Sequence, residues 1–254
     1  SRYDWRAAAG PITLKHLPSQ GTEVISIHTE SRITSAILDK LPNLKLIVTR
    51  TAGVDHIDLA ACHRRKVAVV NCPGLNASSV AEFTFALLLS YQRRLPEALQ
   101  DGKKLLLGSE KLAGLELAGK TLGIVGTGAI GQRVAQIGAG FGMKLLGYDA
   151  KRNAKAAKKL GLTYLGLKQL LQRSDVVSIH VPATPLTEHM FNRSLLGHIK
   201  HNAILVNTAR GSVVEPKAVL WALDNGKLQA YLTDLLDKEQ QIYLHGRAIP
   251  VSYT

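Results

Sequence analysis

The sequence predicts an α/β protein whose parallel β-sheets are covered by helices. Two observations support this fold class: short apolar runs alternate with helical stretches along most of the 254 residues, and several of these runs end in glycine or in a polar cluster. Buried parallel strands read as continuous apolar runs, and each connection between them needs a crossover, usually a helix. No internal repeat or low-complexity tract interrupts the pattern.

The composition is that of a folded protein, with 46% apolar and 20% charged residues. The longest mostly apolar stretch, residues 80–91, contains Glu82 and is too short to cross a bilayer. Because no charged-then-apolar leader opens the chain, we expect a cytoplasmic protein with no membrane partner. Cys62 and Cys72 lack metal-ligand spacing, which favours reduced thiols and no metal site.

The net charge of +13 raises the question of an anionic partner. The basic residues are dispersed along the chain, and there is no arginine-rich arm, zinc-binding spacing or alternation of aromatic and basic residues. We therefore interpret the charge as a solvated surface and expect no nucleic-acid partner.

The first 95 residues alternate loosely between apolar runs and helical stretches. The predicted strands here are residues 22–29, 44–53 and 66–74. A long helix is predicted for residues 77–94, because Val80, Phe83, Leu87 and Tyr91 form one stripe at helical spacing. The Pro- and Gly-punctuated stretch that follows suits a domain crossing, so we place a boundary near residue 95.

From residue 120 the alternation becomes regular. The predicted strands are residues 120–126, 144–149, 175–181, 203–209 and 227–234. Helices are expected between them, among them residues 152–161, 193–202 and 215–226, the last with proline near its start and glycine at its end. Strands and helices that alternate at this interval indicate a parallel sheet.

The glycine-rich turn "GTGAIG" carries the sharpest functional signal. Gly126, Gly128 and Gly131 have the spacing G-x-G-x-x-G and lie between a predicted strand and a predicted helix. In dinucleotide-binding domains the first glycine permits the tight turn, the second lets the backbone approach a pyrophosphate, and the third lets helix and strand pack closely. The turn therefore predicts a dinucleotide site.

Two neighbouring features refine that prediction. The helix that starts at Ala129 and Ile130 would present free N–H groups to the pyrophosphate. Asp149 ends the next strand and would accept hydrogen bonds from the adenosine ribose. Its negative charge would repel a 2′-phosphate, so the sequence favours NAD over NADP, a preference that the nearby Arg152 tempers.

Six stretches in order resemble the D-isomer-specific 2-hydroxyacid dehydrogenase family: "TAGVDHIDL", "NASSVAEFTFALLL", "GIVGTGAIGQRVA", "HVPATPLTEHMFN", "NTARGSVVE" and "YLTDLLDKE". The resemblance implies two doubly wound parallel-sheet domains, Rossmann- and flavodoxin-like, with the cofactor domain inserted into the substrate domain. Residues 1–95 would form the substrate domain and residues 96–234 the NAD-binding domain. Residues 235–254 would be a remnant of the return to the substrate domain.

The resemblance also implies a substrate site for a small anionic 2-oxo or 2-hydroxy acid. Arg210 would pair with the substrate carboxylate and polarise the keto oxygen, as a guanidinium fork can. The backbone N–H groups of Ala52 and Gly53 would bind the same carboxylate. Glu239 would raise the pKa of a catalytic histidine so that its imidazolium can donate a proton.

The cofactor contacts implied by the resemblance come from two further segments. Thr208, Ala209 and Asp234 would line the nicotinamide, with Asp234 holding its carboxamide. The residues expected on the adenosine side are His180, Val181, Pro182 and Thr187.

One part of the family pattern is missing. Members carry the catalytic histidine in a Pro-His motif well after the glutamate, and this chain has no Pro-His pair. His245 is the only histidine after Glu239, and its surroundings do not match the motif. We therefore expect a chain shortened at both ends rather than a divergent enzyme. Gln240, where many members have proline, inclines the substrate prediction towards D-lactate and pyruvate.

Three functions remain open on these grounds. The leading one is an NAD-dependent oxidoreductase of D-2-hydroxy acids. The second is an NAD(H)-binding regulator similar to the transcriptional corepressors of the family, and the third is an inactive fragment that still binds NAD. The resemblance also suggests a homodimer, with residues 96–118 as a plausible arm.

Overall fold

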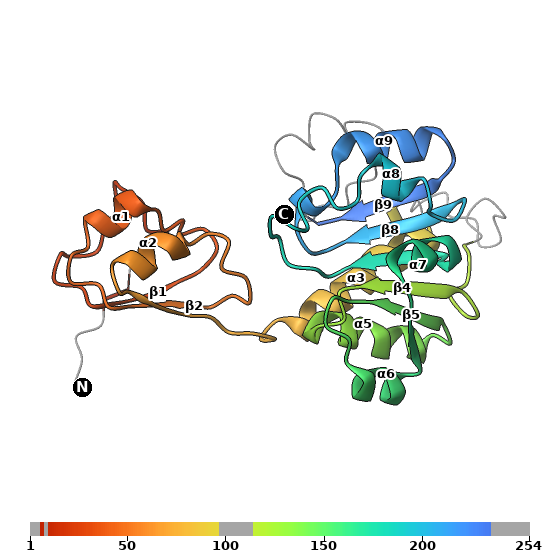
Figure 1. The fold of residues 1–254 in the computed structure, drawn as a ribbon, viewed down its shortest axis with the longest axis horizontal. Helices are drawn as coiled ribbons and strands as arrows, with labels where there is room; N and C mark the ends of the chain where they lie inside the picture. The colour runs from red at the N-terminus through yellow and green to blue at the C-terminus, as the bar shows by residue number, and fades with distance from the viewer. Residues whose placement is uncertain (1–5, 8–9, 97–113, 235–254) are drawn as a thin grey trace, which may run out of the picture. The chain divides into compact units, whose positions relative to one another are not determined.

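The computed structural model describes residues 6–7, 10–96 and 114–234, and the chain divides into two compact units between Asn76 and Ala77 (Figure 1). Each unit has its own parallel sheet, so the predicted α/β class is confirmed. None of the helices in these ranges is long and apolar enough to cross a membrane.

The first unit contains a three-stranded sheet in the order β1-β2-β3, with all strands parallel. The strands are β1 (Val24–Ile27), β2 (Leu46–Thr49) and β3 (Ala68–Val70), and the helices α1 (Ser35–Asp39) and α2 (Leu59–Arg64) connect them. Along β1, Ile25 and Ile27 are buried, whereas Val24 is 48% exposed. This alternation means that the described part of the sheet buries one face against its helices.

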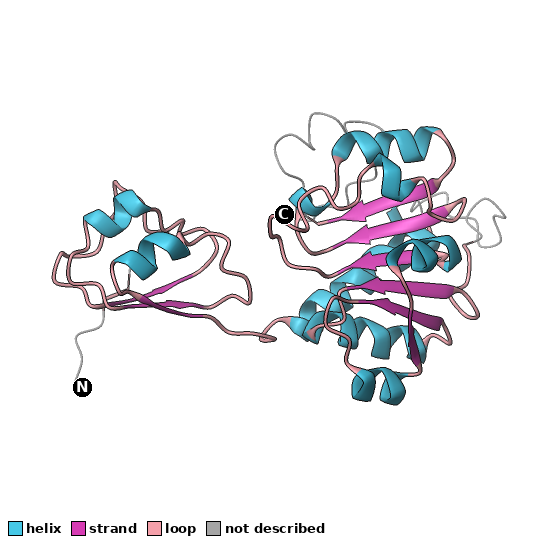
Figure 2. Ribbon diagram, viewed as in Figure 1, coloured by secondary structure: helices cyan, strands magenta, loops and turns pink. Residues whose placement is uncertain are grey.

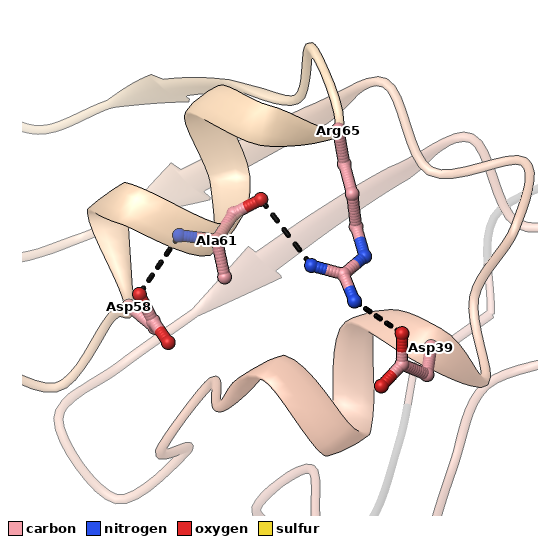
Figure 3. Close-up of polar contacts among 4 residues, drawn as sticks. All are labelled: Asp39, Asp58, Ala61 and Arg65. Atoms are coloured by element: carbon pink, nitrogen blue, oxygen red, sulfur yellow. Dashed lines mark hydrogen bonds and ion pairs between the residues drawn. The ribbon is translucent and has the colours of Figure 1, made fainter.

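Polar contacts fix the two helices of the first unit to each other (Figure 3). Asp58 caps α2 by accepting a hydrogen bond from the backbone N–H of Ala61 at 2.8 Å. Arg65, which follows α2, donates to the Ala61 carbonyl and forms an ion pair with Asp39 at the end of α1. The helices are thereby joined at their ends as well as through the apolar core.

The second unit contains a six-stranded parallel sheet in the order β6-β5-β4-β7-β8-β9. Its strands are β4 (Thr121–Val125), β5 (Lys144–Tyr148), β6 (Leu162–Tyr164), β7 (Val176–Ile179), β8 (Ala203–Asn207) and β9 (Leu228–Thr233). The chain runs outwards from β4 to β6, returns to the centre and then runs outwards to β9. This is the doubly wound order, and sheets of this kind bind ligands at the carboxyl ends of the strands where the direction reverses, here β4 and β7.

Helices cover both faces of this sheet (Figure 2). One apolar core contains residues of α3 (Ala77–Gln92) and α5 (Ala129–Gly140), and α6 (Ala154–Leu160) packs at its edge. The core on the other face contains residues of α7 (Leu167–Arg173), α8 (Arg193–Leu196) and α9 (Pro216–Asp224). Every residue of β7 and β8 is buried as a result, which explains their continuous apolar sequences.

The structure places the domain division earlier than the sequence did. The predicted boundary near residue 95 followed the end of a helix, but α3 packs on α5 and therefore belongs to the second unit. Its buried face also differs from the predicted stripe. Leu87 is buried, whereas Val80, Phe83 and Tyr91 are half-buried. Ala81, Thr84, Phe85 and Leu88 are buried with Leu87.

Two elements of the second unit differ from their predicted extent. The strand β6 was not predicted, because it has three residues and follows directly on the glycine that ends α6. The predicted helix 193–202 is helical only over α8, which ends before Gly197. The five strands that were predicted for this unit are confirmed as β4, β5, β7, β8 and β9, each shorter than predicted by one to three residues.

Candidate functional site

The glycine turn follows β4 directly, and two of its glycines are required by the fold. Gly126 has φ of +95° and donates its N–H to the Tyr148 carbonyl at 2.8 Å. A Cβ at Gly126 would lie 2.7 Å from the carbonyl group of His180, and a Cβ at Gly131 would overlap the carbonyl oxygen of Gly126. Side chains at either position would therefore push α5 and the turn away from the sheet.

Gly128 has a different environment. It is the N-cap of α5 with φ of −67°, which any residue can adopt, and a Cβ there would meet nothing within 4 Å. No side chain caps this helix, so the first N–H groups of α5 face the open space beside Gly128. A cradle of free N–H groups at a helix N-terminus fits a pyrophosphate.

Asp149 lies at the carboxyl end of β5, beside this cradle. Its Oδ2 accepts hydrogen bonds from the backbone N–H of Thr127 at 2.6 Å and from the Thr127 hydroxyl at 3.1 Å, and its Oδ1 accepts from the N–H of Lys151 at 2.8 Å. The guanidinium of Arg152 lies over the ring of Tyr164, 5.7 Å from its centre. The carboxylate is thus held in place next to the glycine turn.

The segment "NTAR" leaves the carboxyl end of β8 and is shaped by a buried asparagine. Asn207 is 0% exposed, and its amide donates to the Arg210 carbonyl at 2.9 Å and to the Tyr231 hydroxyl at 3.1 Å. Its Oδ1 accepts from the N–H of Ala209 at 3.1 Å. These bonds close the turn, and the half-buried Arg210 donates from its guanidinium to the Ala209 carbonyl at 2.7 Å.

Asp234 follows β9 and lies near Arg210. Burial raises the pKa of its carboxyl, and a backbone hydrogen bond and the positive charge of Arg210 lower it in part. Its Oδ1 is buried and accepts no hydrogen bond from the described residues. A buried acceptor without a donor is costly, which suggests that a ligand group satisfies it.

The segment after β7 is held by hydrogen bonds to residues near it in the sequence. The Nε2 of His180 lies 2.8 Å from the Ser178 hydroxyl, and its Nδ1 is buried without a partner among the described residues. Burial lowers the pKa of His180 to about 3, so the imidazole is neutral. The Thr187 hydroxyl donates to the Pro182 carbonyl at 2.6 Å, which shapes the loop that follows Val181.

Ala52 and Gly53 belong to the first unit. Their carbonyls are held by the Asn71 amide and the Thr51 hydroxyl, both at 2.7 Å. Within the described ranges their backbone N–H groups donate no hydrogen bond, so they are available to an anion. Glu239 and His245 lie outside the described residues, and so does the segment that would return to the first unit.

The structure therefore brings most of the predicted cofactor residues to one edge of the six-stranded sheet. The glycine turn, Asp149, His180, Arg210 and Asp234 follow β4, β5, β7, β8 and β9, and the carboxyl ends of parallel strands share one edge. In the parts of the chain that are described, no cluster of three His, Cys, Asp or Glu side chains could hold a metal ion.

The sequence did not indicate two residues that shape this site. Asn207 reads as part of the "NTARG" motif, but nothing local shows that its amide bonds Tyr231, 24 residues later. Thr84 reads as a polar residue within a helix, yet its hydroxyl contacts that of Thr208. Both partners are set by the sheet order, which sequence spacing does not reveal.

Comparison with known proteins identifies this arrangement. Residues 85–247 match the sequence model of the D-isomer specific 2-hydroxyacid dehydrogenase, NAD binding domain. The chain belongs to this family. Its six-stranded unit is therefore the family's NAD-binding domain, and the predicted resemblance is confirmed.

Individual relatives cover several activities within the family. A D-3-phosphoglycerate dehydrogenase of Methanocaldococcus jannaschii is 36% identical over 85% of this chain and 42% of its own length. A glyoxylate reductase of Aeropyrum pernix is 38% identical over 90% of this chain and 71% of its own. The chain thus spans between less than half and about seven tenths of the length of these relatives.

The solved structures that are similar include D-lactate dehydrogenases. The enzyme of Aquifex aeolicus, complexed with NAD and lactic acid, has a TM-score of 0.81 and 38% identity, and the match covers 92% of this chain and 73% of that one. The apo-structure of the Escherichia coli enzyme has a TM-score of 0.77 and 32% identity, covering 89% and 72%.

Proposed function

We propose that this chain carries the cofactor site, and part of the substrate site, of an NAD-dependent oxidoreductase. The reaction is hydride transfer between NAD(H) and a small 2-oxo or D-2-hydroxy acid, with pyruvate and D-lactate as the first pair to test. The observation that supports this most is the placement of the open cradle at Gly128 and the cation Arg210 at the same edge of one sheet. One feature suits a pyrophosphate and the other a carboxylate.

The residues present fit the cofactor in chemical terms. The N–H groups at the start of α5 would bind the pyrophosphate, and Asp149 would bind the adenosine ribose. Asp234 offers a buried acceptor for the amide of the nicotinamide, next to the backbone of Thr208 and Ala209. The loop closed by Thr187 would flank the adenosine side. Once bound, the nicotinamide supplies or accepts the hydride.

The Asp149 carboxylate supports a preference for NAD over NADP. Thr127 and the N–H of Lys151 hold both oxygens beside the glycine turn, so the negative charge stays where a 2′-phosphate would approach. Arg152 contacts the Tyr164 ring, which limits its freedom to neutralise that charge. To test this preference, the NADH and NADPH dissociation constants are measured for the wild type and for Asp149→Ser. The difference between the two constants should be smaller in Asp149→Ser than in the wild type.

The substrate side of the proposal rests on Arg210. Its guanidinium can bind a 2-oxo carboxylate and stabilise the charge that develops on the carbonyl oxygen as hydride arrives. The backbone N–H groups of Ala52 and Gly53 suit the same carboxylate, and Glu239 is the proposed partner of the proton-donating histidine. A homodimer remains part of this proposal and can be measured by light scattering.

The test combines binding with turnover. NADH fluorescence is titrated with this chain, and NADH oxidation is then followed with pyruvate, glyoxylate and hydroxypyruvate. We expect this chain to bind NADH, and we expect turnover of at least one acid where a proton-donating histidine completes the site. Arg210→Ala should lower the catalytic efficiency, kcat/KM, by about 100-fold or more, because a charge-assisted bond in the transition state is lost. Failure to bind NADH would overturn the cofactor site. Binding without turnover would favour the NAD(H)-binding regulator or the inactive fragment instead.

A further inference from the structure

A buried pair of hydroxyl groups joins the helix α3 to the turn that carries Arg210. Thr84 lies in the middle of α3 and is 2% exposed, and Thr208 follows β8 and is 6% exposed. Their Oγ1 atoms are 2.9 Å apart, although 124 residues separate them in the chain. The pair is a polar contact between this helix and the "NTAR" turn.

The direction of the hydrogen bonds follows from a second contact. The Thr84 hydroxyl donates to the Val80 carbonyl one helical turn earlier, at 2.9 Å. A hydroxyl has a single proton, so towards Thr208 the oxygen of Thr84 can only accept. The chain of bonds therefore runs from Thr208 to Thr84 to Val80, and the Thr208 oxygen keeps only acceptor capacity for any other group.

The turn is consequently held from two sides by different means. Asn207 bonds the Ala209 N–H and the Arg210 carbonyl, which fixes the shape of the turn itself. Thr208 bonds Thr84, which fixes the position of the turn relative to a helix on one face of the sheet. Loss of the first contact would change the conformation of the turn, whereas loss of the second would release a correctly shaped turn from its support.

We propose that Thr84 is a positioning residue for residues 207–210, and that it acts through the Thr208 hydroxyl. Without the Thr84 oxygen, the buried Thr208 donor has no acceptor on α3 and the turn moves to satisfy it. The consequence for NADH affinity rests on the proposed function, because Thr208 and Ala209 are there assigned to the nicotinamide. The consequence for the turn itself does not depend on that assignment.

The experiment uses Thr84→Val, which keeps the shape of the side chain and removes the hydroxyl, and Thr84→Ser, which keeps the hydroxyl. Ser174→Ala is the matched control, because the buried Ser174 hydroxyl also donates to the carbonyl four residues earlier, at 2.7 Å, but Ser174 precedes β7 and so lies at the opposite end of the parallel strands from the turn. Three quantities are measured for each protein: the melting temperature, the NADH dissociation constant, and hydrogen–deuterium exchange of residues 207–211.

The expected results separate positioning from simple stability. Thr84→Val should raise the NADH dissociation constant about fivefold to tenfold, the value of one hydrogen bond, and speed exchange in the turn. Thr84→Ser should leave both the NADH dissociation constant and the exchange rate of the turn at wild-type values. Ser174→Ala should lower the melting temperature and leave these two quantities unchanged. In a Thr208→Val background, Thr84→Val should add little, because the shared contact is already lost.

Other outcomes are equally decisive. If Thr84→Val lowers the melting temperature and leaves both exchange in the turn and NADH affinity at wild-type values, the contact is structural only and the proposal is overturned. If the wild type binds no NADH but Thr84→Val still speeds exchange in the turn, the proposed function fails and the positioning role stands.

Discussion

Gly128 and Gly131 lie in one turn, yet they are glycines for opposite reasons. A Cβ at Gly131 would overlap the Gly126 carbonyl oxygen, so the protein itself forbids a side chain there. A Cβ at Gly128 would meet no protein atom within 4 Å, and the backbone conformation does not require glycine. Packing therefore does not exclude a side chain at position 128, and the proposed reason for the glycine is a ligand that approaches the backbone.

These two glycines give a matched pair of substitutions. Gly128→Ala should cost about 1 kcal/mol or less in unfolding free energy, the difference between glycine and alanine at an N-cap, while it weakens NADH binding at least tenfold by blocking the cradle. Gly131→Ala should instead cost several kcal/mol through overlap with the turn. Urea unfolding and NADH fluorescence measure the two effects. Equal NADH affinity in Gly128→Ala and the wild type would contradict the placement of the pyrophosphate.

Individual residues of the site were predictable to different degrees. The positions of the three glycines and Asp149 after β4 and β5 could be predicted because each is fixed relative to a strand that is apparent in the sequence. The position of Arg210 after β8 could be predicted in the same way, and the roles of these residues stay predictions. The bonds of Asn207 to Tyr231 and of Thr208 to Thr84 could not be predicted, because they depend on which strands and helices become neighbours.

The residue that follows β7, His180, has a strongly lowered pKa. This strand lies in the centre of the sheet, and His180 follows it with its Nδ1 buried; burial lowers the pKa of His180 to about 3 from an unfolded value near 6.5. Between these two pH values the unfolded chain binds a proton that the folded chain does not bind. The unfolding free energy therefore falls as the pH is lowered through this window and is unaffected by His180 above it.

This pH dependence can be measured by substitution. Below pH 6.5 the wild type should lose at most about 1.4 kcal/mol per pH unit through His180, and His180→Gln should lack that part of the slope. Carboxylates such as Asp175 titrate in both proteins, so the difference between the two curves isolates the histidine. Urea unfolding at pH 5.0 and 7.5 suffices for the comparison. Parallel curves would show that His180 titrates normally and that its ring is solvated.

At the level of elements, the sequence predicted buried strands well and short or amphipathic elements less well. The strands β7 and β8 are apolar throughout because both faces are covered, and this is visible in the sequence. The three residues of β6 are too few for any periodicity to be seen. The buried face of α3 was misjudged because it combines Phe85 and Leu88 with the small residue Ala81 and the polar residue Thr84, and the helix is apolar on several sides.

The whole molecule contains separate apolar cores. One core lies in the first unit and is formed by side chains such as Ile27, Leu38 and Ile47. Two others cover the two faces of the six-stranded sheet in the second unit. The proposed cofactor residues all come from the second unit, whereas Ala52 and Gly53 come from the first. A domain with its own core can unfold on its own, and a ligand stabilises the domain that it binds.

Calorimetry should therefore show two unfolding transitions with different responses to NADH. At a concentration about 100 times the dissociation constant, NADH should stabilise the second unit by about 2.7 kcal/mol and raise the midpoint of its transition. The midpoint of the transition of the first unit should not change. Gly128→Ala serves as the control, because with tenfold weaker binding at the same NADH concentration it should keep both transitions and reduce the stabilisation to about 1.4 kcal/mol or less. Since all proposed cofactor contacts lie after Ala77, an equal shift of both transitions would mean that the units unfold as one cooperative body and that the division at this residue has no thermodynamic counterpart.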